Sequence, residues 1–68
     1  MKQPIIFTNR DVLGDLLCVR CEFTEKFSDI YVYNCFFYIN NVYKTQFVAK
    51  VENYSELQDK CYDYMLNF

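Results

Sequence analysis

The side chains with the widest chemical repertoire in this sequence are four cysteines, Cys18, Cys21, Cys35 and Cys61. The C-x-x-C spacing of Cys18 and Cys21 invites a zinc or disulfide interpretation, but metal-binding knuckles place that spacing on a tight turn. Here it lies within Leu16–Phe23, LLCVRCEF, which alternates like a strand. Residues three apart on a strand point to opposite faces, so these two thiols can neither pair nor share a metal ion. We therefore predict free thiols and no metal site, with Cys21 and Cys61 as small core residues.

Few other residues are suited to catalysis. The sequence has no histidine, which is the commonest acid–base group, and its single glycine, Gly14, cannot form a Gly-rich phosphate loop. A thiol nucleophile needs a neighbouring base or cation, and Cys18 beside Arg20 is the one candidate pair. We expect neither an enzyme nor a cofactor.

The charged residues suggest one further binding surface. The net charge is −2, with seven basic and nine acidic residues and no basic run, so charge alone does not indicate a nucleic-acid binder. Four acids near the C-terminus follow one another at spacings of four, three and four: Glu52, Glu56, Asp59 and Asp63. Such a row can imitate phosphates and engage a basic groove, although a solvated helix face is its commoner meaning.

The stretch that must organise these residues in space is Ile30–Val51. Two ten-residue runs, rich in β-branched and aromatic residues, flank Asn40 and Asn41. Asparagine tolerates the positive φ angles of a two-residue hairpin turn better than any residue except glycine. The turn places Ile39 opposite Val42, so that the numbers of opposed residues add up to 81.

In this register each face of the hairpin takes alternate residues from both strands. The second strand decides which face is buried, because its odd positions are mostly apolar. The predicted core face therefore comprises Ile30, Val32, Asn34, Phe36 and Tyr38 with Tyr43, Thr45, Phe47, Ala49 and Val51. The predicted outer face comprises Tyr31, Tyr33, Cys35, Phe37 and Ile39 with Val42, Lys44, Gln46, Val48 and Lys50.

The segments before the hairpin predict one or two more strands. Residues 3–8 indicate a short strand or an extended lead-in, and residues 9–15 a loop or a single helical turn. Leu16–Thr24 alternates as a half-buried strand does. Its inner face comprises Leu17, Val19, Cys21 and Phe23. The polar residues 24–29 predict a loop in which Phe27 turns inward.

The end of the chain predicts a helix from about Ser55 to about Asn67. Ser55 and Gln58 fit a capping box, and Glu56 and Asp59 suit the first turn of a helix. At 100° per residue one apolar face emerges. That face comprises Tyr54, Leu57, Cys61, Tyr64, Met65 and Phe68.

Together these elements predict one small α+β domain over residues 1–68. Its two layers are an antiparallel sheet of three to four strands, with the central hairpin 30–51, and one C-terminal helix packed on one face. The N-terminus does not resemble a secretory signal, and the sequence has no run of eighteen apolar residues that could span a membrane. We therefore expect a cytoplasmic protein without a membrane partner.

The predicted outer face of the hairpin is unusually apolar for a surface exposed to water, and such patches usually mark a contact. A protein partner could cover it, or the N-terminal segment could fold across it, or the assumed register could be wrong. A second copy could also cover it, in a homodimer joined through Tyr31, Tyr33, Phe37 and Val48, which we favour for the free form. The candidate partner-binding residues are Tyr31, Tyr33, Phe37, Val48, Lys44 and Lys50.

The same face permits one alternative from another class. Lys44 would lie opposite Phe37, and Lys50 opposite Tyr31, and aromatic rings framed by cations can hold single-stranded nucleic acid. The lysine stems could equally cover the rings of their neighbours. With few cations on an acidic chain, we consider nucleic acid the less favoured ligand.

We therefore expect a small non-catalytic module that occupies the surface of a partner protein. Residues with AT-rich codons (Phe, Tyr, Ile, Asn and Lys) supply 29 of the 68 positions. Such a bias in so short a chain suggests a bacteriophage or another mobile element. The most concrete form of the prediction is an inhibitor of a host protein or defence factor.

Overall fold

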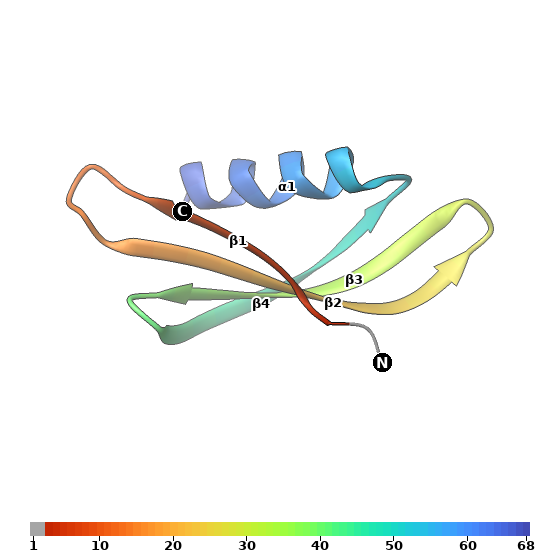
Figure 1. The fold of residues 1–68 in the computed structure, drawn as a ribbon, viewed down its shortest axis with the longest axis horizontal. Helices are drawn as coiled ribbons and strands as arrows, with labels where there is room; N and C mark the ends of the chain where they lie inside the picture. The colour runs from red at the N-terminus through yellow and green to blue at the C-terminus, as the bar shows by residue number, and fades with distance from the viewer. Residues whose placement is uncertain (1–2) are drawn as a thin grey trace.

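The computed structural model describes residues 3–68, which form a four-stranded antiparallel sheet and one helix (Figure 1). The strands follow one another in the sheet in the order of the sequence, β1-β2-β3-β4. Their bounds are β1 Ile5–Arg10, β2 Leu16–Phe27, β3 Ile30–Ile39 and β4 Val42–Val51, and the helix α1 is Tyr54–Leu66. The predicted two-layer α+β fold with a C-terminal helix is confirmed.

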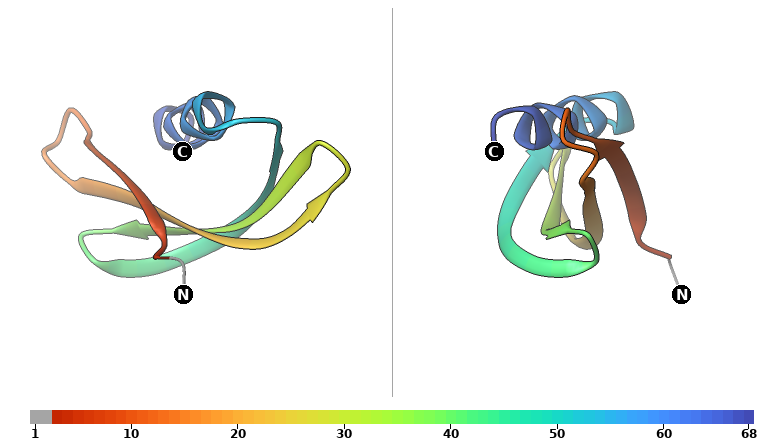
Figure 2. Two further views of the ribbon diagram at one scale, coloured as in Figure 1. Left: turned by 45° about the vertical axis from the view of Figure 1, so that its right-hand side comes forward. Right: turned by 90° about the vertical axis from the view of Figure 1, so that its left-hand side faces the viewer.

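The sheet is twisted and curved, and α1 lies across one of its faces (Figures 1 and 2). The helix contacts both edge strands, β1 and β4, as well as β2. In the right-hand view of Figure 2, β1 and β4 descend on opposite sides beneath the helix. The sheet therefore has one face covered by α1 and one face that no other described element covers, which we call the covered face and the open face.

The two asparagines form the predicted β3–β4 turn, with φ angles of 50° at Asn40 and 68° at Asn41. Asn40 also connects this turn to β2. Its backbone N–H donates to the Leu16 carbonyl at 2.8 Å, and its Oδ1 accepts from the Leu16 N–H at 2.9 Å. Its Nδ2 donates to Asp15 Oδ1 at 3.0 Å. The turn therefore contributes to tertiary structure as well as to the hairpin.

Residues 9–15 divide between strand and loop, and no helical turn forms there. β1 extends through Arg10, and Asp11 organises the turn that follows. Asp11 Oδ1 accepts hydrogen bonds from the backbone N–H groups of Leu13 and Asp15, both at 2.9 Å. Gly14 has a φ of 89°, which a glycine adopts without strain. The turn chemistry of aspartate and glycine thus favours the loop, and the alternative of a helical turn is not realised.

The predicted loop over residues 24–29 is largely strand. β2 continues to Phe27, and a turn at Ser28 and Asp29 connects it to β3. The pairing slips by one residue between Phe23 and Glu25, where the Thr24 hydroxyl donates to the Val32 carbonyl at 3.0 Å. The inward orientation predicted for Phe27 is wrong, since its side chain is 74% exposed at the end of the strand.

A β-bulge changes the register of the central hairpin. Next to the turn, Ile39 pairs with Val42 and Tyr38 with Tyr43, as predicted. The register shifts before Phe37, which pairs with Thr45, so the numbers of opposed residues then add up to 82. From there to the far end, odd-numbered residues of β3 lie opposite odd-numbered residues of β4. The full set of these pairs is Phe37 with Thr45, Cys35 with Phe47, Tyr33 with Ala49 and Tyr31 with Val51.

The predicted faces are consequently right for most of β4 and wrong for β3. Cys35 and Phe37 are fully buried on the covered face together with Ala49 and Val51. Phe36 and Tyr38, predicted as core, lie on the open face instead. The physical reason is the extra residue in β4, because one inserted residue exchanges the two faces of the paired strand.

The core lies between α1 and the covered face. Its eleven buried residues come from all four strands and the helix: Phe7, Leu17, Val19, Cys21, Cys35, Phe37, Ala49, Val51, Leu57, Cys61 and Met65. The alternation predicted for β2 is confirmed at Leu17, Val19 and Cys21. Aromatic rings extend the core, and the most closely packed pair is Tyr64 stacked on Phe47 at 4.2 Å between centroids.

The helix begins one residue before the predicted start, and its N-cap lies two residues before the predicted cap. Asn53 is the N-cap, and its Oδ1 accepts from the Glu56 N–H at 2.9 Å. The predicted cap at Ser55 is therefore wrong, because Asn53 followed by Glu56 is an equally good cap pattern. Of the predicted apolar face, the central residues Leu57, Cys61 and Met65 are buried. The two ends, Tyr54 and Phe68, are largely exposed, although their rings contact Phe7 and Phe37.

Candidate functional site

The structure divides the predicted partner-binding residues between the two faces of the sheet. Phe37 is 0% exposed, and its ring centroid lies 5.4 Å from that of Tyr64 and 4.6 Å from that of Phe68. Tyr31 and Tyr33 are half-buried on the covered face and pack against the core. Val48, Lys44 and Lys50 are exposed. The pairs predicted for the lysines do not form, since Thr45 lies opposite Phe37 and Val51 opposite Tyr31.

The open face of the sheet carries an aromatic cluster that the sequence placed in the core. Arg20 pairs with Phe36, and its guanidinium carbon lies 5.2 Å from the Phe36 ring centroid and 5.8 Å from that of Tyr38. Tyr38 also meets Tyr43 edge to face at 5.9 Å. We call Arg20, Phe36, Tyr38, Tyr43 and Val48 the aromatic patch. Val48 lies two residues along β4 from Gln46, the residue that pairs with Phe36, and so shares the open face with it.

The charge of the aromatic patch is largely balanced. Arg20 forms an ion pair with Glu22 at 3.3 Å, and its Nε is buried without a hydrogen-bond partner among the described residues. The guanidinium is held over two rings by cation–π attraction, worth about 0.5–1 kcal/mol at exposed sites. Arg20 thus orders the patch and leaves it with little excess positive charge.

The acidic row lies on and next to α1, where two of its members support the helix ends. Glu56 Oε1 accepts from the Glu52 N–H at 3.3 Å at the N-terminus. Asp63 accepts from Asn67 Nδ2 through its carboxylate at 3.1 Å and its carbonyl at 2.8 Å. Glu52, Asp59 and Asp63 are exposed and Glu56 is half-buried. The row is therefore partly accounted for by helix capping.

Three of the four cysteines meet in the core. Cys21 from β2, Cys35 from β3 and Cys61 from α1 have Sγ atoms that all lie within 4.8 Å of one another. The Cys21 and Cys61 sulfurs are 3.4 Å apart. Each of the three side chains is at most 1% exposed, and all are free thiols. We call these three residues the thiol cluster.

The sequence predicted two members of the thiol cluster in the core and missed the third. Cys21 and Cys61 were assigned to inward faces of a strand and a helix. Cys35 was assigned to the outer face of the hairpin, because the uninterrupted register put it there. No signal in the sequence distinguishes the two faces of this strand, because Phe36 and Phe37 are adjacent and favour burial of opposite faces.

The protonation of the thiol cluster depends on its internal hydrogen bonds. The side-chain hydrogen bonds with Cys35 and Cys61 raise the pKa of the Cys21 thiol, and burial raises it further. The bonds with Cys21 and Cys61 lower the pKa of Cys35. The bond with Cys21 lowers the pKa of Cys61, but the bond with Cys35 and burial outweigh it and the pKa rises. The hydrogen bonds within the cluster therefore favour ionisation of Cys35 over that of Cys21 and Cys61.

Cys18 lies apart from the cluster, on the opposite face of β2 from Cys21, as predicted for residues three apart on a strand. It pairs with Thr8 and Tyr38 and is half-buried. Burial raises the pKa of the Cys18 thiol, and the nearby Arg20 charge offsets this only in part. The arrangement does not favour a reactive thiolate at neutral pH.

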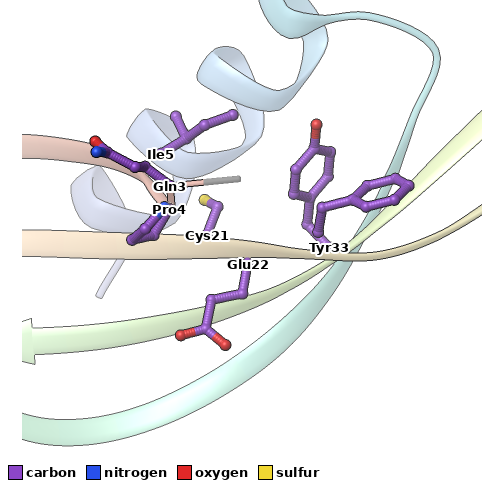
Figure 3. A pocket seen from close by; sticks show the side chains of 7 residues that line it. Gln3, Pro4, Ile5, Cys21, Glu22 and Tyr33 are labelled. Carbon is purple, nitrogen blue, oxygen red and sulfur yellow. The ribbon is translucent and has the colours of Figure 1, made fainter. Parts of the chain in front are cut away.

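A groove of about 400 Å³ adjoins the thiol cluster at the start of β1 (Figure 3). Its lining residues are Gln3, Pro4, Ile5, Cys21, Glu22, Phe23 and Tyr33. In Figure 3 the Cys21 sulfur and the Tyr33 hydroxyl both point to the side of the sheet where the helix lies, whereas the Glu22 carboxylate points to the other side. Burial raises the pKa of Tyr33, so its hydroxyl is neutral at neutral pH. The groove brings solvent close to Cys21.

Comparison with known protein families, with curated protein sequences and with solved structures finds no match for this chain. Within residues 3–68, α1 is too short and too polar to cross a bilayer as a helix.

Proposed function

We propose that this protein is a small non-catalytic binding module that occupies a surface of a partner protein through the open face of its sheet. The observation that carries the proposal is the aromatic patch on a face that no described element covers. Tyr43 and Val48 are about half exposed there, at 51% and 55%. Exposed aromatic and aliphatic groups beside an arginine are the composition typical of protein interfaces.

The patch suits a protein better than single-stranded nucleic acid. Arg20 lies over the Phe36 and Tyr38 rings, where a base would have to stack. Its charge is also balanced by Glu22, so it offers little attraction to phosphate. Nucleic-acid binding remains the alternative, because Lys50 is an exposed cation on the open face, where it pairs with Val32.

The most concrete version of this proposal is an inhibitor that a phage or another mobile element encodes. The inhibitor would act in the host cytoplasm against a host protein or defence factor. The AT-rich amino-acid composition and the small size of the chain support this version. The acidic row on α1 is the second surface through which such an inhibitor could act, against a partner with a basic groove.

A pull-down from bacterial lysate, followed by direct affinity measurement with the purified partner, tests the proposal. The test variant is Tyr43→Ser with Val48→Lys, two exposed positions on the aromatic patch. The matched control is Leu66→Lys, an exposed apolar position on α1. We expect the double variant to bind at least about tenfold more weakly, as hot-spot loss usually costs 1.4 kcal/mol or more. The control should bind as the wild type does.

Three results would contradict the proposal. Capture that nuclease treatment abolishes would favour the nucleic-acid alternative. Loss of binding in Leu66→Lys alone would place the surface on the helix. Equal affinity of the double variant and the wild type would exclude the aromatic patch as the interface.

A further inference from the structure

The thiol cluster is the feature of this molecule with the most unexplained chemistry. Its cysteines are separated by fourteen and twenty-six positions in the sequence, and they belong to two strands and the helix. Packing alone can explain a single cysteine in a core, since free cysteine behaves as a small hydrophobic residue. Among residues 3–68, three of the eleven buried core residues are nevertheless cysteines, and their sulfurs all lie within 4.8 Å of one another.

We propose that Cys21, Cys35 and Cys61 form a buried binding site for one Cu(I) ion, held by three sulfur ligands. Soft thiolate ligands select Cu(I) and other thiophilic metals over hard cations. The site is distinct from the C-x-x-C spacing in the sequence, since Cys18 lies on the opposite face of β2 and takes no part in it.

The sulfur positions fit a three-coordinate ion. Three sulfurs at about 2.3 Å from one ion, the usual metal–thiolate distance, lie about 4.0 Å apart in a planar triangle. The Cys21 and Cys61 sulfurs are 3.4 Å apart, and no two of the three sulfurs are more than 4.8 Å apart. The three sulfurs are therefore already close to the spacing that such a triangle requires.

The surroundings favour Cu(I) over Zn(II). Zinc sites in proteins are almost always four-coordinate, with a fourth protein ligand or a water. The sequence has no histidine, and no carboxylate of the described residues joins the group of three sulfurs. The three side chains are 0–1% exposed, so the structure provides three sulfur ligands in a buried setting. Cu(I) is stable with three sulfur ligands, and so needs no fourth.

The binding step is a ligand exchange without electron transfer. Each coordinating thiol releases its proton, and its sulfur donates a lone pair to the ion. The positive charge of the ion offsets part of the negative charge that the thiolates bring into the apolar core. The groove beside Cys21 and Tyr33 provides the path by which the ion enters and the protons leave.

Occupation of this site would join α1 to the centre of the sheet. The ion would connect Cys61 of the helix to Cys21 and Cys35, which are paired residues of β2 and β3. Because metal binding to a site that the unfolded chain lacks stabilises the folded state, Cu(I) should raise the thermal stability of the protein.

An anaerobic titration of the reduced protein with Cu(I), in competition with a chromophoric Cu(I) chelator, tests the site. We expect one Cu(I) per chain, and X-ray absorption showing three sulfur neighbours at about 2.3 Å. The melting temperature should rise on binding. Cys35→Ala should lower the Cu(I) affinity by more than about 100-fold, since even outer-shell changes cost 10–100-fold at metal sites. Cys18→Ala is the matched control and should bind Cu(I) as the wild type does.

A labelling experiment on the native wild type covers the case in which Cys35→Ala does not fold. Bound Cu(I) should slow the maleimide reactions of Cys21, Cys35 and Cys61 and leave that of Cys18 unchanged, as read by mass spectrometry. The proposal would be overturned by wild-type protein that retains no Cu(I), or by unchanged labelling of the three buried thiols. Two sulfur neighbours instead of three, equal binding by a folded Cys35→Ala variant, loss of binding in Cys18→Ala, or displacement of Cu(I) by equimolar Zn(II) would also overturn it.

Discussion

Phe36 and Phe37 are adjacent in the sequence and lie on opposite faces of the sheet. Phe37 is fully buried between Tyr64 and Phe68, whereas Phe36 lies on the open face under the Arg20 guanidinium. Nothing in the two side chains distinguishes them, because they are identical. Their difference is set by the register of β3 against β4, and a single bulged residue decides that register.

The energetic consequence of this register can be measured at the two positions. We expect Phe37→Ala to destabilise the protein by about 3–5 kcal/mol, the usual cost of emptying a buried phenylalanine site. Phe36→Ala should cost about 1–2 kcal/mol, because it removes a half-buried ring and a cation–π contact. Urea denaturation monitored by circular dichroism measures both. A larger loss at Phe36 than at Phe37 would mean that the bulge is absent and the faces are exchanged.

Phe47 gives a second measure at the residue scale. It is half-buried and stacked on Tyr64, so both the predicted and the observed register place it on the covered face. Phe47→Ala should cost about 2–4 kcal/mol, slightly less than a fully buried phenylalanine. The same denaturation series measures it, and a loss below 1 kcal/mol would contradict the packing of Tyr64 against β4.

At the scale of elements, local signals in the sequence predicted most of this structure. The Asn40-Asn41 turn, the alternation of Leu16–Thr24 and the apolar face of the helix all correspond to observed elements. The bulge in β4 could not be read from the sequence, because Tyr43, Lys44 and Thr45 alternate as an unbroken strand would. Both candidate sites depend on that bulge. It moves Cys35 into the thiol cluster and Phe36 and Tyr38 onto the open face.

The two asparagines of the β3–β4 turn should differ in their contribution to stability. Both have positive φ, but Asn40 also bonds Leu16 and Asp15 through its side chain. Asn40→Gly keeps the backbone conformation and loses these bonds, so we expect a loss of about 1–2 kcal/mol. Asn41→Gly is the matched control and should change stability by less than about 0.5 kcal/mol. Equal effects in urea denaturation would show that the side-chain bonds of Asn40 contribute nothing.

The helix start offers a comparable test. Asn53 caps α1, whereas Ser55 lies within its first turn. Asn53→Ala should therefore cost about 1 kcal/mol, the typical value for a lost N-cap, and Ser55→Ala should be nearly neutral. Thermal unfolding of the two variants checks the assignment. A larger loss of stability in Ser55→Ala than in Asn53→Ala would show that Ser55 is the N-cap.

At the scale of the whole molecule, α1 covers one face of the sheet, and no element within residues 3–68 covers the other. The homodimer predicted through Tyr31, Tyr33, Phe37 and Val48 cannot use that surface as a unit, because Phe37 is buried under α1. The reason for expecting a dimer persists, since the apolar excess has moved to the aromatic patch. Arg20 of that patch lies beside Glu22, so two copies related by a two-fold axis would place opposite charges within reach.

We therefore expect the free protein to form a homodimer through the open face, and the proposed partner to compete with it. Sedimentation equilibrium at tens of micromolar should show a dimer for the wild type and for Leu66→Lys. Tyr43→Ser with Val48→Lys should be monomeric, because it removes two exposed apolar groups and sets two added lysines close together at the axis. A monomeric wild type would contradict the homodimer and would leave the partner as the proposed occupant of the open face. A dimer that survives the double variant would place the contact on an edge strand, β1 or β4, whose outer backbone groups have no neighbouring strand in the described sheet.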